Sequence, residues 1–117
     1  MAKYETLSQR QPDYIDENRP LAEALASVLY KSQGKLNDAS LTTQVQQDYP
    51  NLNTTNKDIR KMLWTFFRSP EEFIKVKIDG NTPGIGTLDD NNTDPIAVTQ
   101  INQDSLYGWF NLKSSMT

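Results

Sequence analysis

The sequence predicts a single α+β domain made of three short helices followed by a β-hairpin. Three segments between residues 20 and 68 repeat apolar side chains at spacings of three and four, which is typical of helices that bury one face. Two later segments, 73–78 and 106–112, alternate apolar and polar residues, which is typical of half-buried strands. The chain has 117 residues, and this length fits one domain with one hydrophobic core.

The first helix is expected to follow an N-terminal arm. Residues 1–19 are polar and carry mixed charge, so we expect a mobile arm with Tyr14 and Ile15 as candidate anchors. A helix from Pro20 to Gln33 is predicted because proline is favoured in a first helical turn and Gly34 supplies a stop. Its buried stripe would consist of Leu21, Leu25, Val28 and Leu29.

Capping residues mark the second and third helices. Asp38 or Ser40 can cap the second helix, which Pro50 ends. Its apolar side would carry Leu41, Val45 and Tyr49. Thr55 and Asp58 have the spacing of a capping box, in which two side chains satisfy the first backbone amides of a helix. The third helix would run to about Arg68 and bury Ile59, Met62, Leu63, Phe66 and Phe67.

The C-terminal half predicts a hairpin with a long acidic loop. The first strand would bury Ile74, Val76 and Ile78 and expose Lys75 and Lys77. A polar loop covers residues 79–94, and residues 95–101 can begin another strand. Residues 106–112 are predicted as the last strand. Its pairing with the first strand would place Tyr107 or Trp109 beside the two lysines. Three helices and then a hairpin is the order of a winged helix-turn-helix. We expect this domain to span residues 20–112 and residues 113–117 to form a C-terminal tail.

Composition excludes most catalytic classes. The chain contains no cysteine and no histidine, which removes disulfides, thiol nucleophiles, Cys-type zinc sites and the commonest general base. We therefore expect a protein that is not an enzyme and that uses no cofactor, metal or small-molecule substrate. No apolar run approaches the roughly 18 residues of a membrane span, and the N-terminal residues lack a signal-peptide pattern. We expect no membrane association and a cytoplasmic location, or a nuclear one in a eukaryotic cell.

Charge is distributed unevenly along the chain. The formal net charge is -3, from 12 basic and 15 acidic residues. Residues 51–78 hold six basic and three acidic side chains, a local charge of +3, whereas residues 79–117 hold five aspartates and one lysine, a local charge of -4. The positive field is therefore concentrated in the third helix and first strand, where an anionic partner would bind.

The outward face of the third helix carries cations around one aromatic residue. On a helical wheel this face consists of Lys57, Arg60, Lys61, Trp64 and Arg68. The first strand adds Lys75 and Lys77. In a helix-turn-helix the second helix of the pair enters the major groove, where cations contact phosphates and forked donors contact base edges. We therefore predict binding of double-stranded DNA in transcription or replication control, with Arg60 and Lys61 best placed for contact.

Other interpretations of this face stay open. A core helix needs a charged solvated face whatever its function, and the N-terminal arm or the long loop would hide Trp64 if either folded over it. With Trp64 as a hot spot ringed by cations, the same face would suit a protein interaction module that docks on an acidic partner such as a polymerase or replication subunit. A third alternative is a protein that imitates DNA through the aspartates of residues 79–104.

Several short stretches share the pattern of a known family. These stretches are Val28-Leu29, Gly34-Lys35-Leu36, Ile59-Arg60-Lys61-Met62-Leu63, Phe73-Ile74-Lys75-Val76 and Tyr107-Gly108-Trp109-Phe110-Asn111-Leu112. Together they resemble the HARE-HTH domain, a family that includes the amino-terminal domain of the bacterial RNA polymerase delta subunit. The resemblance covers about residues 20–112 and implies a winged helix that binds DNA or polymerase, without catalytic residues. The long acidic connection departs from the family pattern, because phosphate would repel an acidic wing.

Overall fold

The computed structural model describes residues 14–32, 36–69, 72–78 and 94–110, and it shows the predicted α+β class. The described elements are α2 (Arg19–Ser32), α3 (Asp38–Asp48), the 3-10 helix η1 (Pro50–Leu52), α4 (Asn56–Phe67), β1 (Ile74–Ile78), β2 (Ile96–Ile101) and α5 (Gln103–Phe110). None of the described helices is long and apolar enough to cross a membrane. The predicted features at Gly34, in residues 79–93 and in the tail lie outside the described residues.

The three predicted helices are present as α2, α3 and α4. α4 begins at the predicted capping box: Asp58 N donates to Thr55 Oγ1 at 3.2 Å and Thr55 N donates to Asp58 Oδ2 at 3.1 Å. The cap of α3 differs from the prediction, because Asn37 Oδ1 accepts from Ser40 N at 2.8 Å and Asp38 is already the first helical residue. Asp38 is therefore available for contacts outside its own helix.

The sheet consists of β1 and β2 in antiparallel pairing. The predicted alternation of β1 is confirmed, with every second residue buried. Lys77 pairs with Ala97 and Lys75 with Gln100, and a bulge interrupts the register after Lys75. On the other edge of β2, Asn37 forms an isolated antiparallel bridge with Ala97. The segment before α3 is thus attached to the sheet.

Residues 103–110 form helix α5, which corrects the prediction of a last strand at 106–112. Asn102 caps this helix, since its Oδ1 accepts from Ser105 N at 3.1 Å. Leu106 and Phe110 are buried four residues apart, a spacing that places both on one helical face. The strand that pairs with β1 is therefore β2.

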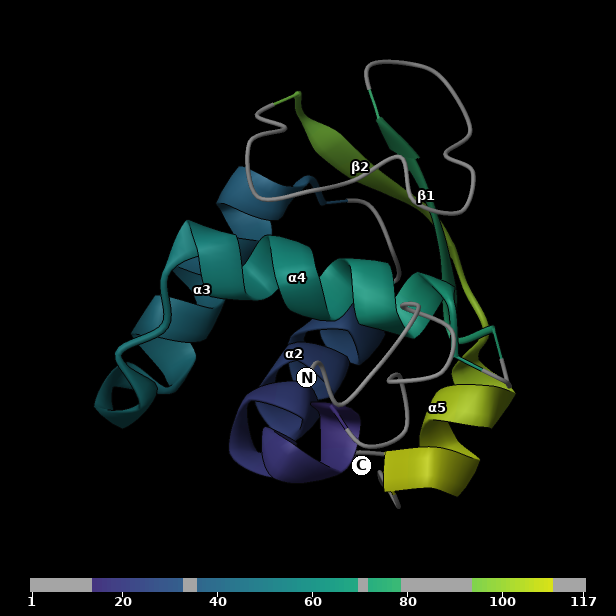
Figure 1. Cartoon of the computed structure of the whole chain (residues 1–117), viewed down its shortest axis with the longest axis horizontal. Helices are drawn as coiled ribbons and strands as arrows, with labels where there is room; N and C mark the ends of the chain where they lie inside the picture. Colours follow the sequence, from purple (N-terminus) through teal and green to yellow (C-terminus); the bar gives the residue numbers. More distant parts are fainter. Residues whose placement is uncertain (1–13, 33–35, 70–71, 79–93, 111–117) are drawn as a thin grey trace, which may run out of the picture.

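One hydrophobic core joins the helices to the sheet. Figure 1 shows α4 crossing the molecule between α2 and the sheet, with α5 beside α2. Residues 14–17 form a helical turn before α2, and the Ile15 side chain is fully buried in the core, with Tyr14 packed against it. The described part of the segment expected to be an arm, residues 14–19, thus packs onto the domain and includes the first residue of α2.

Candidate nucleic-acid interface

Arg60 lies in a partly buried polar network. Its Nη1 donates to Asp38 Oδ2 at 3.1 Å and to the backbone oxygen of Asp94 at 2.8 Å. The Asp38 carboxylate also accepts from the backbone amide of Ile96 and from Asn56 Nδ2, both at 3.1 Å. The side chains of Arg60 and Asp38 are only 12% and 9% exposed. These five residues, here called the Asp38–Arg60 clamp, tie α3, α4 and the start of β2 together.

The clamp keeps Asp38 ionised. Burial by itself would raise the pKa of the Asp38 carboxyl, because it takes water from the charged form. The hydrogen bonds from Ile96, Asn56 and Arg60, together with the charge of Arg60, outweigh burial and hold the pKa of Asp38 below its ordinary value. Arg60 and Lys61 are the residues predicted to be best placed for contact with phosphates and base edges. The structure instead uses the Arg60 guanidinium to fix α4 against α3 and β2.

Trp64 is buried, which corrects the prediction of an exposed indole. The residue is 2% exposed. Its ring centroid lies 5.5 Å from that of Phe67, and the Arg68 guanidinium carbon lies 4.3 Å from the Trp64 ring centroid. The indole Nε1 is buried with no hydrogen-bond partner among the described residues. A buried ring cannot act as a docking hot spot, so the proposed role of Trp64 at the centre of a protein interface is not supported by its position.

Lys57 and Lys61 lie one turn apart on α4, outside the core. Lys57 is exposed and Lys61 is half-buried. Lys61 Nζ lies 5.1 Å from the centroid of the Tyr14 ring, within the range of a cation–π attraction. The predicted cationic face of α4 is therefore divided between an exposed lysine, a lysine held against an aromatic ring and an arginine inside the clamp.

Lys75 and Lys77 are exposed on the outer face of β1, opposite the side chains that enter the core. Lys75 Nζ lies 3.7 Å from Glu72 Oε1, in an exposed pair of the kind that contributes little stability. Tyr107 and Trp109, predicted beside these lysines, lie on α5. The outer face of the neighbouring strand carries Ala97, Thr99 and Gln100 instead. The predicted interleaving of cations and aromatic rings on the sheet is thus wrong.

The end of the sheet that carries Lys77 lies beside the clamp. Lys77 pairs with Ala97, and the preceding residue, Ile96, donates to Asp38. Figure 1 shows this end of the sheet near the start of α3. Lys57 and Lys61 thus directly follow the clamp residues Asn56 and Arg60 in the sequence, and Lys77 is paired with the residue that follows Ile96.

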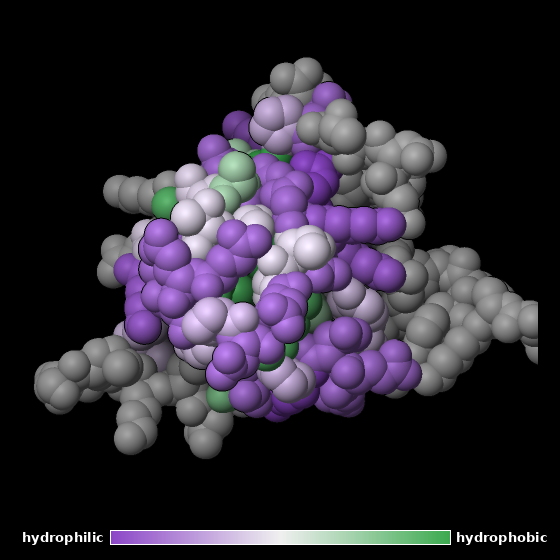
Figure 2. Space-filling model, turned by 90° about the vertical axis from the view of Figure 1, so that its left-hand side faces the viewer, coloured by the Kyte–Doolittle hydropathy of each residue, from purple (hydrophilic) through white to green (hydrophobic). Residues whose placement is uncertain are grey.

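Helix α3 itself offers no positive charge. Figure 2 shows the side of the molecule on which α3 lies, and hydrophilic residues dominate its described part. The exposed residues of α3 are Ala39, Ser40, Thr43, Gln46, Gln47 and Asp48. This helix contains no basic residue, so it can contribute hydrogen bonds to a partner but no cation.

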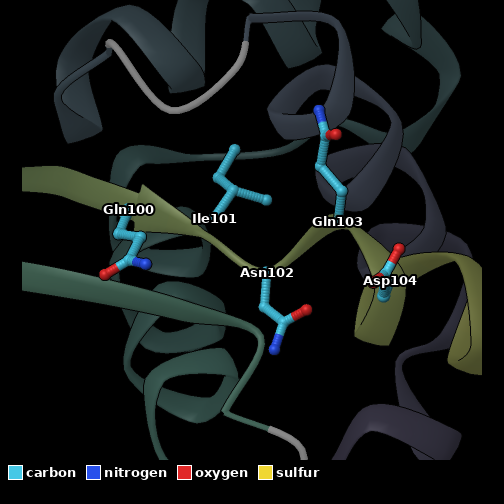
Figure 3. A pocket seen from close by; sticks show the side chains of 5 residues that line it. All are labelled: Gln100, Ile101, Asn102, Gln103 and Asp104. Carbon is cyan, nitrogen blue, oxygen red and sulfur yellow. The ribbon is translucent and has the colours of Figure 1, made fainter.

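A shallow pocket at the junction of β2 and α5 has a volume of about 360 Å³ and is lined by residues 100–104. In Figure 3 the side chains of Ile101 and Gln103 point to one side of the chain, and those of Gln100 and Asn102 point to the other. They do not converge on a common ligand position. No group of three or more acidic residues within the described part of the chain could hold a metal ion.

The roles of two clamp residues are not predicted from the sequence. Asp38 is predicted only as a helix cap, and no role is predicted for Asn56. Their partners lie 18 to 58 positions away in the sequence, so no local pattern could have identified the network. Comparison of the chain with family models, with curated proteins and with solved structures found no match.

Proposed function

We propose that this chain is a winged helix-turn-helix, resembling the HARE-HTH family, that binds double-stranded DNA through the lysines next to the Asp38–Arg60 clamp. The observation that carries the proposal is the arrangement of the clamp. The clamp fixes α4 against the start of β2. Lys57 and Lys61 lie on α4, and Lys77 lies on β1, the strand that pairs with β2. DNA binding of this kind would serve transcription or replication control.

The element order supports the winged-helix part of the proposal. α3 and α4 form a helix pair joined through η1, and an antiparallel hairpin follows, as in winged members of the helix-turn-helix class. The bridge between Asn37 and Ala97 attaches the residue before α3 to the edge of β2. α5 is an addition to this order. In the proposed complex α4 is the helix that approaches the major groove.

The chemistry favours phosphate contact over base recognition. Arg60 and Asn56 carry the forked donor and the amide best suited to base edges, and both donate to Asp38. Lysines act as point charges toward phosphate. We therefore expect DNA binding with little sequence preference, driven by Lys57, Lys61, Lys75 and Lys77. Four phosphate contacts would lower log K by about 3.6 per log unit of salt.

A fluorescence anisotropy titration with a labelled duplex of about 20 base pairs tests the proposal. We expect affinity to fall roughly a hundredfold when salt is raised from about 50 to 200 mM. A duplex of shuffled sequence should bind equally well. An anisotropy that does not change with protein concentration at low salt would refute DNA binding.

Charge reversal identifies the interface. Lys57→Glu should weaken binding to all duplexes and lower the salt slope by about 1. Lys31→Glu is the matched control, because Lys31 is an exposed lysine at the end of α2 and its reversal changes the net charge equally. Equal losses in the two variants would mean that affinity follows net charge and that α4 is not the contact helix.

A further inference from the structure

The helical turn at residues 14–17 touches the face of α4 that is proposed to meet DNA. Lys61 Nζ lies 5.1 Å from the Tyr14 ring centroid. At the C-terminal end of the predicted cationic face of α4, the Arg68 guanidinium carbon lies 4.3 Å from the Trp64 ring centroid. Two cations of this face, Lys61 and Arg68, are thus held against aromatic rings. Of the two, Lys61 is the one held by a residue from another part of the chain.

Tyr14 is positioned by folded structure. The next residue, Ile15, is fully buried in the core. The Tyr14 backbone oxygen accepts from both Asn18 N and Asn18 Nδ2 at 3.0 Å, and Ala22 N donates to the Asn18 backbone oxygen at 2.9 Å. The turn therefore continues into α2, and the ring is held over Lys61 by a built element of the fold.

We propose that Tyr14 is an autoinhibitory contact, in which its ring and a DNA phosphate compete for the ammonium group of Lys61. This inference rests on the proposed function. The ring covers one side of the ammonium group of a half-buried lysine, so a phosphate that approaches from that side must displace the ring. A partner or a proteolytic cut that displaces residues 14–17 would then release a cation at the centre of the interface.

Acylation of lysine amines tests the contact without DNA. Tyr14→Leu keeps an apolar side chain but removes the ring, whereas Tyr14→Phe keeps the ring and its cation–π attraction. We expect Lys61 in the leucine variant to react about two- to fivefold faster with an acetylating reagent, measured by peptide mass spectrometry. The phenylalanine variant should react like the wild type, and Lys57 serves as the internal reference. An unchanged rate at Lys61 overturns the inference.

DNA titrations then test the competition. Tyr14→Leu should raise the affinity for a duplex about two- to fivefold and leave the salt slope near that of the wild type, because Lys61 is already one of the four lysines counted in that slope. Tyr14→Phe should match the wild type. If Lys61 of Tyr14→Leu is acylated faster but the affinity for DNA is unchanged, the contact between Tyr14 and Lys61 stands and its competition with phosphate is refuted. Absence of DNA binding in every variant refutes the proposed function, and the acylation result still decides whether Tyr14 holds Lys61.

Both tests need a folded variant, which a circular-dichroism melt establishes. If Tyr14→Leu unfolds, Tyr14→Met replaces it, since methionine is also apolar, lacks a ring and adapts to irregular gaps. Rapid acylation of every lysine would reveal unfolding, whereas release of the contact changes the rate at Lys61 alone.

Discussion

Replacing Arg60 by alanine should destabilise the fold far more than replacing an outward helical cation. The Arg60 side chain is 12% exposed, and its removal leaves behind an Asp38 side chain that is 9% exposed. Removing one partner of a buried ion pair costs about 3–5 kcal/mol. Asp38 keeps its hydrogen bonds from Ile96 and Asn56, so we expect the lower end, about 3 kcal/mol. For a domain of this size that loss lowers Tm by about 12 °C.

Urea unfolding at neutral pH, followed by tryptophan fluorescence, measures this loss. Lys57→Ala is the control on the same helix, because Lys57 is exposed and its removal should change the unfolding free energy by less than about 0.5 kcal/mol. The Asp38→Asn variant and the double variant complete a cycle that isolates the coupling between the two residues, expected at about 1–3 kcal/mol. A loss below about 1 kcal/mol in Arg60→Ala would show that Arg60 is not held as the structure has it.

The same variant changes the response to acid. Because the pKa of folded Asp38 lies below its ordinary value, the carboxylate stabilises the fold above about pH 4, and this stabilisation is lost as pH falls through the folded pKa. Without Arg60 the pKa of Asp38 should rise. The difference in unfolding free energy between wild type and Arg60→Ala should therefore shrink as pH falls below about 4. A difference that stays constant with pH would contradict the ion pair.

Other contacts predict changes in stability and titration. Trp64→Ala should cost about 3–5 kcal/mol through lost packing, whereas Trp64→Phe should cost less because it also removes a buried indole N–H that has no partner among the described residues; urea unfolding compares them. Thr55→Ala and Asp58→Ala should each cost about 1 kcal/mol, with less than additive loss when combined, since both break one capping box. Burial and the neighbouring Tyr30 raise the pKa of Tyr107 to about 12, so Tyr30→Phe should lower it in an ultraviolet titration.

Features with local signals were predictable. The capping box at Thr55 and Asp58 brings its partners within three residues, and the period of two in β1 separates buried from exposed side chains along one strand. α5 also had a local signal, because Asn102 precedes Asp104 and Ser105 as a cap and the spacing of Leu106 and Phe110 suits a helix. The alternating pattern of residues 106–112 suggested a strand, and over so few residues the two periods cannot be separated.

Features that depend on distant segments were not predictable. A helical wheel places Trp64 among outward cations because it considers α4 alone, and it carries no information on segments that pack over the helix. Asp38 and Arg60 are 22 positions apart, and either residue alone reads as an ordinary surface charge. The DNA-binding hypothesis depends on six cations that gather on one face around an exposed indole. The structure instead gives those residues different roles.

These roles imply that different basic residues of α4 contribute to the stability of the fold and to DNA binding. Arg60 makes its contacts inside the fold and sets the position of the helix, so Arg60→Ala, assayed at a temperature where it is still folded, should keep the salt slope of the wild type. Lys57 contributes charge at the surface, so Lys57→Glu should keep the wild-type unfolding free energy within about 0.5 kcal/mol and lose part of the salt slope. Lys61 lies between the two cases, because a ring from another segment holds it. If Arg60→Ala lowered the slope while remaining folded, Arg60 itself would contact phosphate, and the clamp would have to open when DNA binds.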